Sequence, residues 1–134
     1  MIEKYHGQYN SGKDFTTLAA WKYARELKIF FYGQVLPKIH YEDKLTLGYQ
    51  IRKTLISITA NIAEGYGRYH YREGIQFYRV SRASLYELKD HLITCYDLNY
   101  ISRQLLLLGI KRIEKTKITL NGYISFTKNL AKAR

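Results

Sequence analysis

The chain has 134 residues, enough for one domain with its own core, and a formal net charge of +11 at pH 7, because its 22 lysines and arginines outnumber 11 aspartates and glutamates. The single cysteine, Cys95, excludes an intrachain disulfide and is expected to fill core space, and no run of about 18 apolar residues marks a membrane span. We therefore expect a soluble, cytoplasmic protein that makes no membrane contact and whose positive charge attracts polyanions such as nucleic acid.

The first part of the sequence predicts an N-terminal arm and two helices. Residues 1–14 mix polar and aromatic side chains without a period, and we expect a flexible arm there. Apolar residues at spacings of three and four predict a helix over about residues 16–35, ended by Pro37. A second helix is expected over about residues 42–65, with acidic residues in its first turn.

The second part predicts two longer helices. One covers about residues 71–98 and ends at Asn99, and the other follows its predicted N-cap, Ser102, nearly to the end of the chain. Long helices with short connections favour antiparallel neighbours. The prediction is an all-α fold in which residues 15–134 form one antiparallel, up-down-up-down four-helix bundle. The expected apolar stripes include Leu45, Val80 and Leu108.

No group of residues in the sequence supports catalysis. A di-metal bundle needs Glu on two helices and Glu-x-x-His on the other two, but only Glu3-x-x-His6 in the arm has that spacing. Gly65 and Gly67 lack the strand and the further residues of a nucleotide-binding loop, so we expect them to end a helix. The serines and histidines form no hydrolase motif. We expect no catalytic residue, metal or other cofactor. A metal-dependent enzyme is therefore the weakest of the three functional hypotheses, and the other two are given below.

Several polar residues fall where helical spacing turns them toward other helices. Carboxylates that face arginines in a packed bundle more often form structural ion pairs than acid-base partners. We therefore expect a structural polar network in which Asn61 and Glu64 fasten helices together. Its expected members are Gln50, Arg52, Asn61, Glu64, Ser84 and Glu87.

Two sets of cations are candidates for nucleic-acid binding. The first alternates with tyrosines such as Tyr69, Tyr71 and Tyr78, a composition that can hold phosphates and stack on unpaired bases; the alternative is that the rings pack at a bundle end and the arginines are solvated. The second belongs to the last helix, where Glu114 is the only acid. The candidate residues are Arg68, Arg72, Arg79, Arg82, Lys111, Arg112, Lys115 and Lys117.

Several motifs follow one another in a set order over residues 15–132. They are Phe15-x-x-Leu18-x-x-Trp21-x-x-Ala24-x-x-Leu27, Gln50-Ile51-Arg52-Lys53, Asn61-Ile62-Ala63-Glu64-Gly65, Gly67-Arg68 and Ser84-Leu85-x-Glu87-Leu88. This order resembles one bacterial family, the four-helix bundle proteins encoded by intervening sequences of large-subunit ribosomal RNA genes. The same fold family includes the accessory variability determinant proteins of diversity-generating retroelements, which partner a reverse transcriptase and bind nucleic acid.

The resemblance implies a homopentameric ring and leaves open whether the chain belongs to a retroelement or to an rRNA insertion. Our first hypothesis is a non-enzymatic, basic ring that binds RNA, DNA or their hybrid electrostatically, as an accessory protein to a reverse transcriptase in the retroelement case. The second is a protein interaction scaffold whose basic surface docks an acidic protein, without a nucleic-acid role.

Overall fold

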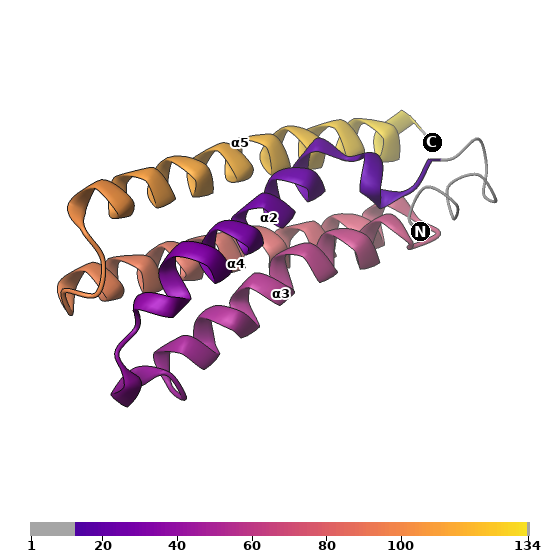
Figure 1. Ribbon diagram of the computed structural model, residues 1–134. Coiled ribbons are helices and arrows are strands. Elements are labelled where there is room, and N and C mark those ends of the chain that lie inside the picture. The colour runs from indigo at the N-terminus through magenta and orange to yellow at the C-terminus, as the bar shows by residue number, and fades with distance from the viewer. Residues whose placement is uncertain (1–12, 134) are drawn as a thin grey trace.

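The computed structural model describes residues 13–133, and helices are the regular elements in this range (Figure 1). Residues 13–133 contain four α-helices: α2 (Ala19–Phe30), α3 (Leu47–Tyr66), α4 (Tyr71–Asp97) and α5 (Arg103–Ala133). The remaining elements are 3-10 turns at Phe15–Thr17, Leu36–Lys38 and Tyr41–Asp43 and a π-helical segment at Phe31–Val35. The described residues contain no strand, so the predicted all-α class with four helices is confirmed.

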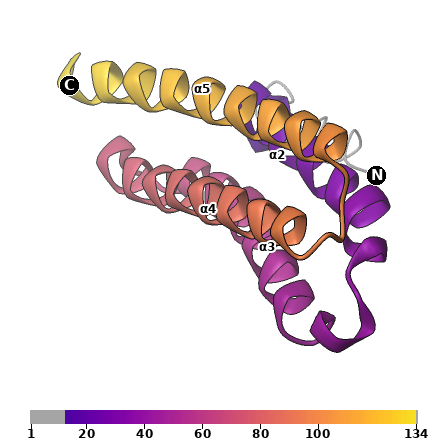
Figure 2. The ribbon, with the colours of Figure 1, turned by 90° about the vertical axis from the view of Figure 1, so that its left-hand side faces the viewer.

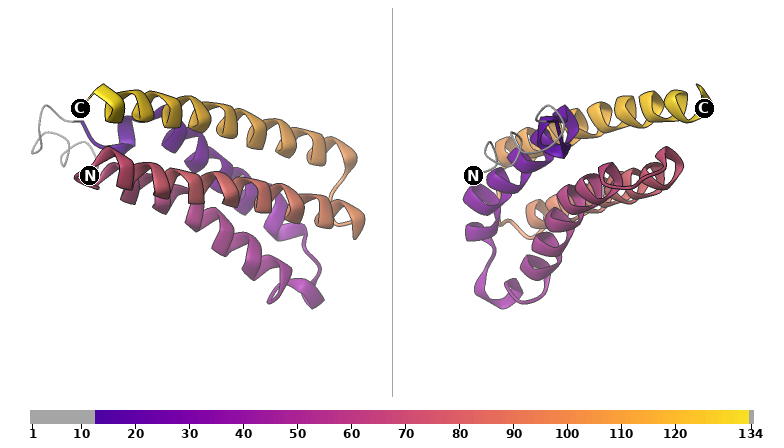
Figure 3. Two further views of the ribbon diagram at one scale, coloured as in Figure 1. Left: turned by 180° about the vertical axis from the view of Figure 1, so that it is seen from behind. Right: turned by 90° about the vertical axis from the view of Figure 1, so that its right-hand side faces the viewer.

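The four α-helices pack side by side, each against two neighbours. The packed pairs are α2 with α3, α3 with α4, α4 with α5, and α5 with α2. Figures 2 and 3 show α2 and α5 in one layer and α3 and α4 in the other. Consequently α3 and α5 lie on opposite corners of the bundle, as do α2 and α4.

The core lies along the axis of this arrangement and receives apolar side chains from all four helices. Cys95 is fully buried there, which confirms its expected space-filling role, and burial raises the pKa of its thiol to about 11. The largest fully buried side chains are Leu27, Phe31, Ile51, Leu55, Ile58, Ile62, Leu85, Leu88, Leu92, Ile113, Leu120 and Ile124.

The second helix begins later than the sequence predicted. Tyr41–Asp43 forms a separate 3-10 turn, and Thr46 has φ −108° and ψ −84°, outside the helical region, so α3 starts at Leu47. The Tyr100 hydroxyl donates a hydrogen bond to the Asp43 carboxylate and so fixes this turn against the chain that joins α4 to α5. Leu45 is 85% exposed, and its expected place in the core is wrong.

Two other predicted core residues also lie outside the core. Val80 is 48% exposed and Leu108 is 40% exposed. Beside Val80, the buried position of α4 is taken by Ser81, whose hydroxyl donates to the Ile58 carbonyl oxygen of α3 at 2.7 Å. A polar group with such a partner can be buried at little cost, and apolar periodicity alone does not identify it.

The signals at the end of α4 and at the beginning of α5 were predicted correctly. Asn99 has φ 63°, a left-handed conformation that Asn tolerates after a helix. Ser102 accepts the Leu105 N–H at 3.1 Å, as an N-cap does. Gly67 follows the last residue of α3, but Gly65 lies inside that helix and is buried, so the prediction that both glycines end the helix holds only for Gly67.

Of the expected arm at 1–14, only Lys13 and Asp14 lie within the described residues, and Glu3-x-x-His6 lies outside them. Asp14 accepts the Thr16 N–H at 2.9 Å and thereby caps the first 3-10 turn. Leu18 is extended, with φ −74° and ψ 129°, so α2 begins at Ala19 and not at Thr16.

Candidate nucleic-acid interface

Four cations gather where the first turns of α4 meet the last turns of α5. Figure 2 shows the backbone of these two helix ends on the same side of the bundle. Arg72 and Arg79 of α4 and Lys128 and Lys132 of α5 line a pocket of about 260 Å³, whose other lining residues are Ile75, Gln76 and Ala131. Among residues 13–133, no carboxylate lines this pocket and no ion pair joins these four cations to an acid. We call these four residues the α4/α5 cation cluster.

Helical spacing explains why the α4/α5 cation cluster forms. Arg72 and Arg79 are seven residues apart on α4, and Lys128 and Lys132 are four apart on α5, so each pair lies on one face of its helix. Ile75 between them is 5% exposed and anchors this face of α4 to the core. The cations therefore stand at the rim of a packed helix pair, and their aliphatic stems can cover apolar surface.

A second pocket adjoins this cluster at the beginning of α4. It has a volume of about 370 Å³ and is lined by His70, Tyr71, Arg72, Glu73 and Ala131, so the two pockets share Arg72 and Ala131. Just outside it, Tyr69 is 86% exposed, and its ring meets the His70 ring edge to face with centroids 4.9 Å apart. The described end of the bundle thus places aromatic rings beside the cluster of cations.

The predicted cations Lys111, Arg112 and Lys115 line a different pocket, of about 320 Å³, between α2 and α5. Glu26 of α2 lines the same pocket and reduces its net positive charge. The Arg112 guanidinium lies 5.2 Å from the centroid of the Phe30 ring, and the Lys115 ammonium 4.7 Å from that of Tyr23. These cation–π contacts stabilise the junction of α2 and α5. Arg112 and Lys115 therefore have structural partners of a kind that the α4/α5 cation cluster lacks within residues 13–133.

The other predicted cations are engaged in contacts between helices. Arg68 lies 3.3 Å from the Glu64 carboxylate and 4.0 Å from that of Glu73, and its guanidinium stands 4.4 Å from the Phe77 ring centroid. Arg82 donates to the Asn121 side-chain oxygen at 3.0 Å and so links α4 to α5. Both arginines are therefore positioned by partners within the chain.

Lys117 is largely enclosed by other side chains. Its ammonium lies 2.8 Å from Glu114 and 4.3 Å from the Tyr86 ring centroid, and its side chain is only 14% exposed. The hydrogen bond from Lys117, together with one from Lys89 of α4 at 3.3 Å, lowers the pKa of Glu114. This group connects α4 to α5, and Lys117 is placed for structure more than for phosphate contact.

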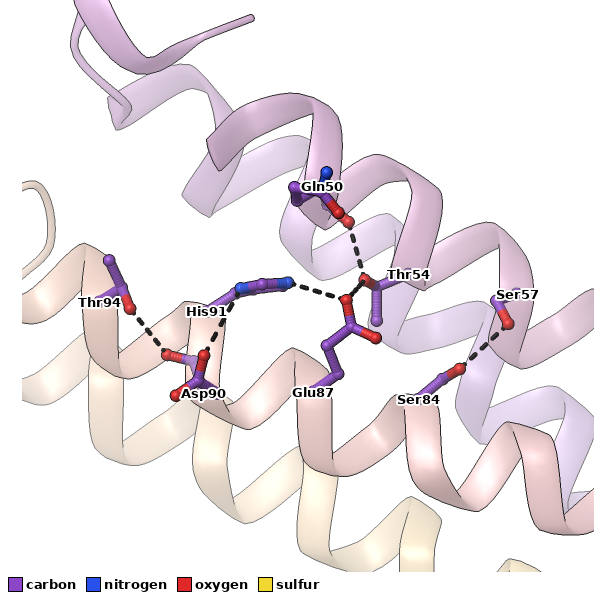
Figure 4. A network of polar contacts seen from close by, with 8 residues as sticks. All are labelled: Gln50, Thr54, Ser57, Ser84, Glu87, Asp90, His91 and Thr94. Atoms are coloured by element: carbon purple, nitrogen blue, oxygen red, sulfur yellow. Dashed lines mark hydrogen bonds and ion pairs between the residues drawn. The ribbon is translucent and has the colours of Figure 1, made fainter. Parts of the chain in front are cut away.

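A network of polar contacts lies between α3 and α4, and Ser84 and Glu87 of the predicted set take part in it (Figure 4). Thr54 donates to the Gln50 backbone carbonyl at 2.7 Å and lies 3.1 Å from the Glu87 carboxylate, which is also 3.1 Å from His91. One turn further along α3, the Ser57 and Ser84 hydroxyls are 3.0 Å apart.

Some predicted members of the network have other roles. Asn61 donates to the Ser57 carbonyl and hydroxyl oxygens at 2.8 and 3.0 Å, so it reaches α4 only through Ser57. Glu64 pairs with Arg68 on the surface, and Gln50 takes part through its backbone. No hydrogen bond or ion pair connects Arg52 to this network within the described part of the chain.

The sequence reasoning missed Thr54, Ser57, Ser81 and His91. Thr54 and Ser57 are three residues apart, as are Ser81 and Ser84, so two small polar pairs on facing helices were the available signal. Within residues 13–133, every buried side-chain nitrogen or oxygen has a hydrogen-bond partner. The network therefore satisfies polar groups at the α3–α4 contact and requires no ligand to do so.

Two further findings concern sites of other kinds. Residues 13–133 contain no group of three or more His, Cys, Asp or Glu side chains placed to hold a metal ion. Over the same range, none of the helices combines the length and the apolar character needed to cross a bilayer.

Comparison with known proteins gave one family match. The family model described as 23S rRNA-intervening sequence protein matches residues 16–122. None of the curated proteins compared with the chain matches it. The matched range contains α2, α3 and α4 completely and α5 as far as Gly122.

Proposed function

The chain belongs to the family of 23S rRNA-intervening sequence proteins, and we propose that it is a non-enzymatic, ring-forming bundle that binds RNA, DNA or their hybrid electrostatically. The observation that carries this proposal is the α4/α5 cation cluster, in which four cations line one pocket to which residues 13–133 contribute no carboxylate. Backbone phosphates are the polyanions that such a cluster fits, and phosphate contacts give affinity with little sequence preference.

The proposed assembly is a homopentamer of antiparallel, up-down-up-down bundles. The connections at 67–70 and 98–102 are short, which favours reversal of the chain between consecutive helices. A ring needs two different complementary surfaces on each subunit. Tyr49 and Ile56 on α3 are 51% and 53% exposed, and Leu107 and Ile118 on α5 are 52% and 69% exposed. Since α3 and α5 occupy opposite corners, these apolar faces are suitably placed to be the two surfaces of a ring contact.

Ring formation would strengthen binding by multivalency. Five copies of a chain with charge +11 carry a formal charge of +55. When one subunit holds a polynucleotide, the others meet it at a high effective concentration. The proposed complex is therefore strong at low salt and weakens steeply as salt is added.

The test is nucleic-acid binding by the full chain as a function of salt. Binding is measured by fluorescence anisotropy with labelled RNA, DNA and hybrid probes. Probes of about 20 nucleotides are long enough to span a site of the expected size. We expect binding to all three at about 50 mM salt and a linear decrease of log K with log salt concentration up to about 200 mM. Absence of binding to every probe at the lowest salt would refute the proposal, and sedimentation velocity reports the assembly state separately.

As an extension of this proposal, the partner protein is a reverse transcriptase for which the ring is an accessory subunit. The positive faces would then hold template or product near the enzyme. A reverse transcriptase gene and a template repeat beside this gene would favour this role over that of an rRNA insertion. Copurification of the two proteins in nuclease-treated extracts tests the contact directly.

The second candidate function is a protein interaction scaffold, favoured by the surface where α2 meets α5. A pocket of about 390 Å³ there is lined by Ile29, Phe30, Gly33, Gln34, Glu26 and Arg112, and Ile29 is 62% exposed. Apolar side chains rimmed by both signs of charge are typical of protein contacts. If the scaffold hypothesis holds, Ile29→Ser removes copurifying protein and leaves nucleic-acid binding unaltered.

A further inference from the structure

We propose that the end of the bundle where α4 begins and α5 ends is a binding site for single-stranded nucleic acid. In this site the α4/α5 cation cluster holds backbone phosphate and an unpaired base stacks on the rings of Tyr69 and His70. The inference rests on the proposed nucleic-acid function and adds to it a preference for single strands and a location.

The first step is the continuity of the two pockets. The pocket lined by the α4/α5 cation cluster, here the phosphate pocket, and the pocket lined by His70 and Tyr71, here the ring pocket, share Arg72 and Ala131, so they form one continuous surface. A nucleotide presents its phosphate and its base to two adjacent places. A pocket of cations beside a pocket of rings fits both parts of that ligand.

The second step is the division of charge between the two pockets. Among the described residues, the phosphate pocket is lined by four cations and no acid, whereas the ring pocket is lined by Glu73, which also lies 4.0 Å from Arg68. A phosphate next to the Glu73 carboxylate would be repelled, while a neutral base would not be. The charges therefore assign phosphate to one pocket and base to the other.

The third step is the state of the rings. Tyr69 is 86% exposed, and its contact with His70 at an interplanar angle of 87° holds the pair edge to face. In that geometry each ring keeps at least one face that the other does not cover. An exposed ring held in this way offers a stacking surface at low cost in side-chain entropy.

The ring pair also explains why a single strand is the expected ligand. In a duplex the bases are already paired and stacked, and only the phosphates remain available to this surface. Stacking on Tyr69 can therefore add affinity only for an unpaired base. The same site should hold a duplex through the cations alone, and so more weakly.

The matched test of the cations uses two double variants on α5. Lys128→Gln with Lys132→Gln removes two exposed cations of the cluster, and Lys111→Gln with Lys115→Gln removes two exposed cations at the same spacing beside α2. Net charge changes equally in both. We expect the first double variant to reduce the salt slope for single-stranded RNA by about 0.7 for each phosphate that the variant no longer neutralises, and the second to change it little. Equal effects of the two variants would show that affinity follows net charge only and would overturn the assigned location.

The test of the rings is Tyr69→Ala, measured with a single-stranded RNA and with the same sequence as a duplex. We expect about a tenfold loss of affinity for the single strand and an unchanged affinity for the duplex. Tyr69 is almost fully exposed, so circular dichroism of the variant should match that of the parent chain. Equal losses for both probes, or none, overturn the inference and leave the proposed function standing. A parent chain that binds neither probe at low salt refutes both.

Discussion

Gly65 of α3 and Gly74 of α4 bring their backbones into direct contact. A Cβ on Gly74 would lie 2.6 Å from the Gly65 carbonyl oxygen, and a Cβ on Gly65 would lie 2.8 Å from the Gly74 carbonyl oxygen. Real Cβ atoms essentially never come so near another atom, and a backbone oxygen cannot move aside as the end of a side chain can. This pair therefore sets how closely the end of α3 approaches the beginning of α4, next to the proposed binding site.

We first predict that Gly74→Ala is destabilising. The added methyl group forces α3 and α4 apart at a buried contact, and overpacking of this kind costs about 1–3 kcal/mol. Gly122→Ala is the matched control, because a Cβ at that helical position meets nothing within 4 Å, and alanine should raise helix stability there by about 0.5–1 kcal/mol. Urea unfolding followed by circular dichroism measures both. A Gly74→Ala chain as stable as the parent would contradict the close approach.

The fold could be predicted from the sequence wherever the signal was local. Asn99 and Ser102 mark helix ends through their own backbone and side-chain chemistry, and both were identified. The contact of Gly65 with Gly74 depends on how two helices pack, and neither glycine reveals it within its own segment. The wrong prediction for Leu45 has the same cause. The turn just before this residue is fixed by a hydrogen bond from Tyr100, which lies far along the chain.

Only part of the candidate site could be predicted, because the rest depends on how the helices pack. The sequence identified Arg72 and Arg79 as candidate phosphate ligands, but Lys128 and Lys132 were not assigned to one site with them, because only packing of α4 on α5 brings the four together. The partner of Lys117 lies three residues away, at Glu114, and helical spacing could have indicated that pair. Arg82 could not be assigned in this way, since its partner Asn121 is on another helix.

A second prediction concerns the buried hydroxyl of Ser81. It donates to the Ile58 carbonyl oxygen at 2.7 Å and joins α4 to α3. Ser81→Ala removes this hydrogen bond, and we expect a loss of about 1 kcal/mol in the free energy of unfolding. Ser125→Ala on the exposed side of α5 is the control, with an expected change within about 0.5 kcal/mol. Equal stability of the two variants would show that the interhelical bond contributes nothing.

A third prediction concerns Glu114, which receives hydrogen bonds from Lys117 and Lys89. These lower the pKa of its carboxyl group in the folded state, so the stabilisation is present above the ordinary pKa of 4.5 and is lost as the pH falls through the lowered value. Glu114→Gln should reduce the free energy of unfolding near pH 7 by less than about 1 kcal/mol, because the carboxylate is partly solvated. The difference from the parent chain should disappear in acid.

The control for Glu114 is Glu42→Gln. The Glu42 side chain is 80% exposed, and the Nδ1 atom of the His40 ring lies 3.7 Å from its carboxylate. We expect almost no change in stability for this variant at either pH. Urea unfolding of both variants near neutral pH and in acid makes the comparison, and a Glu114→Gln difference that persists unchanged in acid would contradict the assigned ion pair.

The fourth prediction is a loss of stability in alkali that depends on Cys95. Burial raises the pKa of this thiol from 9.0 to about 11, so the folded chain keeps the proton over a range in which the unfolded chain releases it. The contribution of the protonated thiol to the free energy of unfolding is complete below pH 9.0 and is lost as the pH rises to about 11.

The Cys95→Ala variant has no thiol, so its stability lacks this dependence on pH. Its smaller side chain packs less well and lowers its stability at every pH. The difference in unfolding free energy between the two chains should therefore narrow from about pH 8 to about pH 10.5. Other groups that titrate in this window are present in both chains and cancel in the difference, so a constant gap would mean that the Cys95 thiol ionises as readily in the folded chain as in the unfolded one.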